Sequence, residues 1–324
     1  MIFSHQRTIL FIDKEKIQWV AGRIPGGKLF GEVQSLSWSE ENLAVALDEV
    51  AKNFPKKLRI VVGEEFSYVT HFSKQDKKSL IIDEAQVLIP EKLQDGWDSR
   101  EENSGDIQVM AVQQWLFSIL EKALLERDLQ VEAIEAESIA MTRMIHEDKG
   151  KAFIFAKNNG KIVLGIAQDG EVLATKIFFK LPEKDYVEEF ISYVTKPKNI
   201  SIERAYVQDE TGNLAKIFKS LKLEVRDEEL SPMLGICRKT DISGRDKDVL
   251  NIFLGKSGKA ESKNGREQKR ANLREKILLA VFLLVIASGA AAVYYMQKSR
   301  QKTVKTTPVT QKVSSDSSGL QWGK

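Results

Sequence analysis

Cysteine and histidine are scarce in this chain of 324 residues, which contains one cysteine, Cys237, and three histidines. A single thiol excludes an intramolecular disulfide bond, and a lack of disulfides is typical of proteins that fold in a reducing compartment such as the cytoplasm. With so few imidazole groups to accompany it, Cys237 is most simply an inert residue of the protein core. The composition therefore excludes a disulfide scaffold.

A large net charge is also missing, because 49 Lys and Arg residues stand against 46 Asp and Glu residues, a formal net charge of +3 at pH 7. The excess is local: residues 256–276 carry eight basic and three acidic residues, and the rest of the chain is close to neutral. A near-neutral body argues against a nucleic-acid-binding protein. The basic stretch could be a nucleic-acid tail, but its place directly before an apolar run favours attraction to anionic lipid headgroups and control of membrane topology.

The apolar run extends from Ile277 to Met296, twenty residues without a charge. As a helix it is roughly 30 Å long, the thickness of the hydrocarbon core of a bilayer, so we expect it to cross a membrane once. A buried core helix is the alternative, but such helices usually keep a polar stripe. The basic flank before the run is richer than the flank after it, which predicts that the N-terminal part lies in the cytoplasm.

No signal peptide is predicted at the N-terminus, because charges from Asp13 to Lys16 interrupt the first apolar run. We therefore expect a single-pass protein of the inner (cytoplasmic) membrane with four regions. They are a cytoplasmic domain over residues 1–255, a basic juxtamembrane linker over 256–276, a transmembrane helix over 277–296 and a short disordered extracytoplasmic tail over 297–324.

The cytoplasmic domain repeats one pattern of strands and helices, which divides it into two lobes over approximately residues 1–150 and 151–255. The first copy is predicted as strands Thr8 to Asp13, Ile17 to Arg23 and Leu29 to Leu36, a helix from Glu40 to Lys52 and a strand from Leu58 to Val62. The second copy is predicted as strands Ala152 to Ala156, Lys161 to Gln168 and Val172 to Phe178, a helix from Glu183 to Thr195 and a strand from Ile202 to Val207. Strands that alternate with helices predict an α/β protein with a mixed sheet.

Further elements are predicted between and after the two copies. They are strands Phe66 to Phe72 and Ile107 to Val112, an amphipathic helix Gln114 to Leu129, a helix Leu214 to Leu221 and a short strand Leu223 to Arg226. The apolar stripe of the helix that starts at Gln114 recurs at helical spacing, and we assign it to the core rather than to a cofactor.

Segments in both copies resemble PilM, the cytoplasmic actin-like protein of type IV pilus assembly, and GspL, its membrane-anchored counterpart in type II secretion. The resemblance covers about Ile9 to Val225 and is carried by ILFIDKEKIQWVAGR from Ile9, DEAQVLIPEKLQDGWD from Asp83, LEKALLERDLQVEAIEAESIAMTR from Leu120 and AFIFAKNNGKIVLGIAQDGEVLATKIF from Ala152. It implies the fold of actin, Hsp70 and FtsA, with duplicated βββαβα lobes and a nucleotide site between them.

The phosphate turns of that fold need an aspartate, a glycine and a hydroxyl residue, because backbone N–H groups must approach phosphate closely. Asp13 stands at the expected aspartate of the first turn, but Glu15 replaces the glycine and Lys16 the hydroxyl residue. Asp13 is then most simply a turn residue. The second turn, Asn158-Asn159-Gly160, has no aspartate, and Gln208 to Thr211 replace the glycine pair that usually cradles adenosine. We expect degenerate phosphate turns, no catalytic residues, no cofactor, no metal and hence a pseudo-ATPase.

A segment before the linker resembles the Asn-Leu-Leu peptide in the N-terminal tail of PilN and at the corresponding junction of GspL. Its candidate docking residues are Leu250, Asn251, Ile252, Phe253 and Leu254. An extended apolar peptide with one central Asn can lie in a groove, but a last strand of the core is an equal alternative. In either case we expect the segment to pack on the actin-like domain. GspL and PilN continue into a folded periplasmic domain after the membrane helix, where this sequence predicts only the short tail.

The preferred function is a non-enzymatic inner-membrane platform protein of a type IV pilus or type II secretion-like machine, which links a cytoplasmic motor ATPase to membrane subunits. The resemblance implies PilN/PilO-like or GspM-like partners and allows a homodimer. One alternative is a membrane-tethered ATPase or sugar kinase of the same superfold, which the degenerate turns disfavour. Another is an FtsA-like cell-division anchor, but such anchors attach through a short amphipathic helix rather than a spanning segment.

Overall fold

The structure is a computed structural model that describes residues 6–24, 27–73, 78–93, 95–101, 105–147, 149–238, 250 and 252. The chain divides into two compact units, Met1–Lys259 and Ala260–Lys324, and every described residue belongs to the first. The expected linker, membrane helix and tail lie outside the described residues. Among the described residues, no helix is long and apolar enough to span a bilayer.

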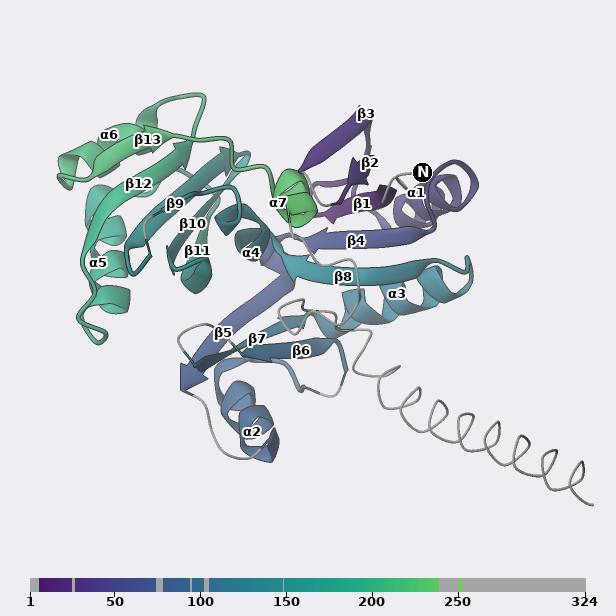
Figure 1. Ribbon diagram of the computed structural model, residues 1–324, viewed down its shortest axis with the longest axis horizontal. Coiled ribbons are helices and arrows are strands. Elements are labelled where there is room, and N and C mark those ends of the chain that lie inside the picture. The colour runs from purple at the N-terminus through teal and green to yellow at the C-terminus, as the bar shows by residue number, and fades with distance from the viewer. Residues whose placement is uncertain are drawn as a thin grey trace, which may run out of the picture. The chain divides into compact units, whose positions relative to one another are not determined.

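The first lobe contains a five-stranded sheet in the order β3-β2-β1-β4-β8 (Figure 1). Neighbours β1 and β2 pair antiparallel, as do β2 and β3, whereas β4 is parallel to β1 and β8 is parallel to β4. The central strand β1 is a continuous apolar run from Ile9 to Ile12, as a strand covered on both faces requires. The strands are β1 (Gln6–Ile12), β2 (Lys16–Arg23), β3 (Lys28–Ser37), β4 (Lys57–Val62) and β8 (Gln130–Ala136).

The second lobe contains a sheet of the same plan, in the order β11-β10-β9-β12-β13 (Figure 1). Its first three strands are antiparallel neighbours, and β12 and β13 are added parallel to β9. The strands are β9 (Ala152–Asn159), β10 (Lys161–Gln168), β11 (Glu171–Phe178), β12 (Ile202–Gln208) and β13 (Glu224–Asp227). Two sheets with one strand order confirm the expected duplication, and this topology is the actin-like arrangement that the resemblance implies.

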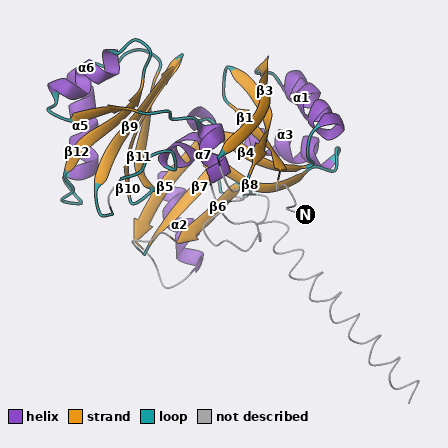
Figure 2. Cartoon of the chain, turned by 45° about the horizontal axis from the view of Figure 1, so that its top comes forward, coloured by secondary structure: helices purple, strands orange, loops and turns teal. Residues whose placement is uncertain are grey.

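Helices connect the parallel strands, because a parallel neighbour cannot be reached by a hairpin. In the first lobe they are α1 (Glu40–Asn53) and α3 (Gln114–Leu125), and in the second α5 (Lys184–Thr195) and α6 (Asn213–Ser220), as Figure 2 shows. Ser39 starts α1 by accepting a hydrogen bond from the Asn42 N–H. Helix α3 ends at Leu125 rather than at the expected Leu129, because Asp128 turns left-handed (φ 51°) and the Leu129 N–H returns to the Leu124 carbonyl.

An insertion between β4 and α3 forms a separate three-stranded sheet in the order β5-β7-β6. The sequence predicts two of its strands but not the short polar strand β6 or the helix α2. Apolar residues of α2, among them Ile81 and Ala85, pack on Val109 and Ala111 of β7. The inserted elements are η1 (Glu64–Phe66), β5 (Ser67–Ser73), α2 (Lys78–Leu88), β6 (Trp97–Glu101) and β7 (Asp106–Val112).

Two short helices lie against the face of the first sheet opposite α1 and α3. They are α4 (Glu137–Thr142), directly after β8, and α7 (Pro232–Arg238), directly after the second lobe. Met233, Ile236 and Cys237 of α7 share one apolar cluster with residues of β1, β2 and β4. The sequence predicts a second lobe over residues 151–255. In the structure α7, which falls within that range, packs on the sheet of the first lobe, so the chain returns from the second lobe to the first.

Close packing holds α7 in place. A Cβ at Gly235 would lie 1.9 Å from the Ala140 carbonyl oxygen of α4, so only glycine allows this approach. The buried Arg59 of β4 donates from Nη1 to the Ile236 carbonyl at 3.0 Å, which satisfies a carbonyl at the end of the helix.

Candidate functional site

The two expected phosphate turns face each other at the boundary between the lobes. The turn between β1 and β2 carries Asp13 and Glu15, and the turn between β9 and β10 contains Gly160 in a left-handed conformation (φ 79°). A Cβ at Gly160 would lie 3.1 Å from Glu15 Oε2. The Glu15 carboxylate therefore stands directly against the second turn, where the fold would need to admit a phosphate.

Asp13 is buried and holds its own turn together. Its Oδ1 accepts hydrogen bonds from the backbone N–H groups of Glu15 and Lys16, each at 2.8 Å. These are the bonds of an Asx turn, in which an aspartate replaces a backbone acceptor. The two N–H groups therefore point at Asp13 and not at a phosphate, which supports the prediction that Asp13 is a turn residue.

Two glutamates follow β4 and extend the acidic side of the site. Glu64 accepts from the Ser138 N–H at 2.8 Å and from the Thr175 hydroxyl at 3.0 Å. Burial raises the pKa of Glu64, although these hydrogen bonds act in the opposite direction. Glu65 accepts from the Lys14 N–H at 2.9 Å, which links the end of β4 to the first turn.

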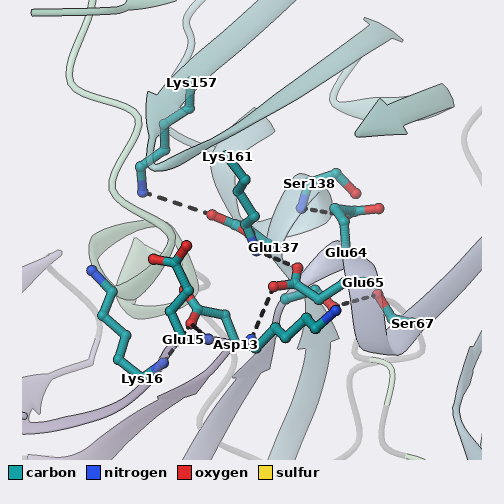
Figure 3. A network of polar contacts seen from close by, with 12 residues as sticks. Asp13, Glu15, Lys16, Glu64, Glu65, Ser67, Glu137, Ser138, Lys157 and Lys161 are labelled. Carbon is teal, nitrogen blue, oxygen red and sulfur yellow. Dashed lines mark hydrogen bonds and ion pairs between the residues drawn. The ribbon is translucent and has the colours of Figure 1, made fainter. Parts of the chain in front are cut away.

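Two lysines of the second lobe reach this acidic side, as Figure 3 shows. Lys161, the first residue of β10, donates a hydrogen bond to Glu65, and its Nζ lies 3.1 Å from Glu137 Oε2. Lys157, near the end of β9, places its Nζ 3.8 Å from Glu137 Oε1. Glu137 opens α4, so the cluster joins the ends of β4 and β8 to the second-lobe hairpin.

The two buried lysines have pKa values shifted in opposite directions. Burial lowers the pKa of Lys157, and its more distant contact with Glu137 does not offset that effect. Burial also disfavours the charged form of Lys161, but the Glu137 and Glu65 carboxylates outweigh it and raise the pKa. Removing one partner of such a buried pair leaves an uncompensated charge, at a cost of about 3–5 kcal/mol.

The segment Gln208 to Thr211, which replaces the glycine pair that usually cradles adenosine, is also held by its own hydrogen bonds. Asp209 accepts from the Leu214 N–H at 2.8 Å and from the Asn158 amide at 3.0 Å, and so ties the start of α6 to the second turn. Although partial burial acts against ionisation, these hydrogen bonds and those from Thr211 lower the pKa of Asp209. At the place where adenosine is usually bound, the Asp209 carboxylate instead accepts a hydrogen bond from the first turn of α6.

The residues present do not fit a magnesium nucleotide. A phosphate at the two turns would meet the Glu15 carboxylate, and the neighbouring lysines already pair with Glu65 and Glu137. Within the described part of the chain, no group of three or more His, Cys, Asp or Glu side chains is arranged to hold a metal ion.

The segment before the linker is described at two positions, Leu250 and Ile252. Both side chains are buried in the largest apolar cluster, which contains residues of both lobes, with 0% and 2% of their surface exposed. The Leu250 carbonyl accepts a hydrogen bond from the Ile134 N–H of β8, the edge strand of the first sheet, at 3.1 Å. The candidate docking residues Asn251, Phe253 and Leu254 lie outside the described residues.

Sequence reasoning missed Glu64, Glu65, Glu137 and Lys161 as members of one cluster. Glu137 follows β8 directly, Lys161 follows the turn at Gly160, and Glu64 and Glu65 come after Gly63 at the end of β4. Charged residues at such positions are the available signal. Their convergence depends on the pairing of β4 with β8 and of β9 with β10, which a single sequence shows only through the duplicated pattern.

Comparison with known proteins gives no family by sequence: no protein-family model matches the chain, and neither does any curated protein. Solved structures of similar fold include a Bacteroides thetaiotaomicron protein with an actin-like ATPase fold, at 10% identity and a TM-score of 0.49 over 74% of this chain and 99% of that one. A PilM–PilN type IV pilus biogenesis complex gives 12% identity and 0.48 over 71% and 96% of the two chains.

The cytoplasmic domain of EpsL, an inner-membrane component of the type II secretion system of Vibrio cholerae, gives 7% identity and 0.46 over 71% and 92%. At this level of similarity the actin-like description of the chain rests on its own duplicated strand order.

Proposed function

We propose that this chain is a non-enzymatic platform protein of a type IV pilus or type II secretion-like machine at the inner membrane. The observation that carries the proposal is an actin-like domain whose interlobe site is filled by its own ion pairs. A domain with this topology, in which a carboxylate and paired lysines stand at the phosphate turns, would act by binding other proteins rather than by hydrolysing a nucleotide. Its partners would be PilN/PilO-like or GspM-like membrane subunits and a cytoplasmic motor ATPase.

The absence of ATPase activity is part of the proposal and is supported by contacts rather than by sequence alone. Asp13 is committed to its own turn, Glu15 stands against Gly160, and Lys161 is paired twice. Phosphoryl transfer needs a phosphate cradle of free N–H groups and a metal ion. In the first turn the N–H groups of Glu15 and Lys16 are bound by Asp13, and among the described residues no group of three or more His, Cys, Asp or Glu side chains could hold a metal ion.

The burial of Leu250 and Ile252 supports the second part of the proposal, a junction of the GspL type. These residues lead from the actin-like domain toward the basic linker at 256–276 and the uncharged run from Ile277 to Met296. Through this attachment, a membrane-spanning helix would hold the domain at the cytoplasmic face of the membrane.

Affinity purification of the tagged full-length chain from detergent-solubilised membranes tests this function. We expect co-purification of pilus or secretion subunits, and a matched control truncated after residue 259 should lose the membrane subunits. Recovery of cell-division proteins would favour the division anchor instead. Purification of the intact chain without any subunit of either machine would refute the platform role.

A further inference from the structure

The two lobes are joined by a buried ion cluster whose charges come from both sides of the gap. Lys161 belongs to the second-lobe hairpin, and its partners Glu65 and Glu137 follow β4 and β8 of the first lobe. The three side chains are only 7%, 7% and 3% exposed. An ammonium held this deeply between carboxylates of another lobe couples the positions of the two lobes, because a displacement that breaks the pairs without admitting water leaves a buried charge without its partner.

A second contact crosses the gap beside the first. Glu64, next to Glu65, accepts from the Thr175 hydroxyl on β11 of the second lobe at 3.0 Å and from the Ser138 N–H of α4 at 2.8 Å. The sequence pair Glu64-Glu65 thus binds the second lobe at two points. One apolar cluster also joins the lobes beside these polar contacts, since Ile139 of α4 shares it with Phe153 and Val163 of the second lobe.

The backbone leaves no space for a ligand inside this cluster. A Cβ at Gly63 would lie 2.8 Å from Glu65 Oε2, 2.9 Å from Asp13 Cβ and 3.1 Å from Lys161 Nζ. The turn after β4 is therefore pressed directly onto the ammonium group and the first phosphate turn. The cluster occupies the place between the two phosphate turns instead of lining it.

We propose that Lys161 is a built-in latch, which takes the place of a bound ligand and holds the two lobes closed. In hinged two-lobed proteins, a ligand that contacts both lobes stabilises the closed state. A covalently attached ammonium makes the same bridge without a binding equilibrium, so closure does not depend on ligand concentration. The closed pair of lobes is then a permanent rigid body, whichever machine the chain serves.

Distances between spin labels on the two lobes test the latch in the full-length chain in detergent. Suitable label sites are Val45→Cys on α1, where the side chain is 54% exposed, and Ser220→Cys at the exposed end of α6. The natural Cys237 is buried and stays unlabelled. We expect a single narrow distance distribution in the parent that does not change when Mg-ATP is added.

Lys161→Met and Glu65→Gln each remove one charge of the latch while keeping side-chain length. Both should broaden the distribution and shift its mean by more than about 2 Å, the scale of domain rearrangements. Lys180→Met, at an exposed lysine of the same lobe, is the matched control and should leave the distribution unchanged.

Two results would overturn the latch. One is a distance distribution like that of the parent in both latch variants, with the native circular dichroism spectrum retained. The ion cluster would then be buried and paired but would not hold the lobes closed. The other is a shift of the parent distribution on addition of Mg-ATP, which would mean that a ligand still controls closure. If Lys161→Met does not fold, Glu65→Gln alone decides between these outcomes.

Discussion

Replacement of Leu250 by alanine tests whether the segment before the linker is part of the folded domain. The Leu250 side chain is fully buried in the large apolar cluster that spans both lobes, and the Leu250 backbone carbonyl accepts a hydrogen bond from the edge strand β8. Truncation of a fully buried leucine removes its transfer free energy and leaves a cavity, at a total cost of about 2–5 kcal/mol. For a protein of this size, a loss of about 3 kcal/mol lowers Tm by about 6–12 °C.

Thermal unfolding of the full-length chain, followed by tryptophan fluorescence, measures this effect. Leu125→Ala is the matched control, because Leu125 lies at the end of α3 with 75% of its surface exposed, and surface changes of this kind stay within about 0.5 kcal/mol. Ile252→Val should give an intermediate loss of about 0.5–1.5 kcal/mol. Equal Tm values for Leu250→Ala and Leu125→Ala would refute the reasoning and make the segment a solvated linker.

Four further outcomes are expected. Calorimetry of the full-length chain with Mg-ATP should show no saturable heat, and micromolar binding with turnover would contradict the pseudo-ATPase. Burial raises the pKa of Cys237 to about 12, so iodoacetamide should modify this thiol in the parent only after the protein is denatured. The Gly235→Ala substitution displaces α7, so in that variant the thiol should react without denaturant. Burial also raises the pKa of Glu64 above its ordinary value of 4.5, so the native protein binds this proton more tightly than the unfolded chain does. The stability that this proton contributes is fully present below the ordinary pKa and is lost as the pH rises through the raised pKa. Denaturant titrations from acid to neutral pH should therefore show a smaller loss for Glu64→Gln than for the parent, and parallel curves would contradict this. Reporter fusions should place the N-terminus in the cytoplasm and residues 303–324 outside it, and an active periplasmic reporter at the N-terminus would reverse the topology.

The hairpins of both lobes could be predicted from the sequence, because their turns depend on local chemistry. Gly160 and Gly170 adopt positive φ, and Asp169 does so beside Gly170, as the Asn-Asn-Gly and Asp-Gly turns predict. The helices α1 and α5 were predictable for a similar reason, since their apolar residues recur at the spacing of one helical face.

Elements that depend on distant contacts were not predictable. Helix α7 has seven residues, too few to show a period, and it forms where Gly235 packs on α4 and Arg59 binds its end. The ion cluster joins Glu65 to Lys161, 96 positions further along the chain, so no local pattern reveals it. The sequence shows that the turns lack the glycine and hydroxyl residues of a phosphate site, and the structure adds that ion pairs between the lobes lie beside these turns.

The return of the chain from the second lobe to the first has a consequence for biosynthesis. Ile9, Phe11 and Val20 emerge early from the ribosome, but the residues that cover them in α7 begin only at Pro232. Early-made domains usually fold before later ones are complete, and an uncovered apolar face favours aggregation. Here the lobe that is started first is completed last, so the nascent chain must keep that face protected until nearly the whole actin-like domain has been synthesised.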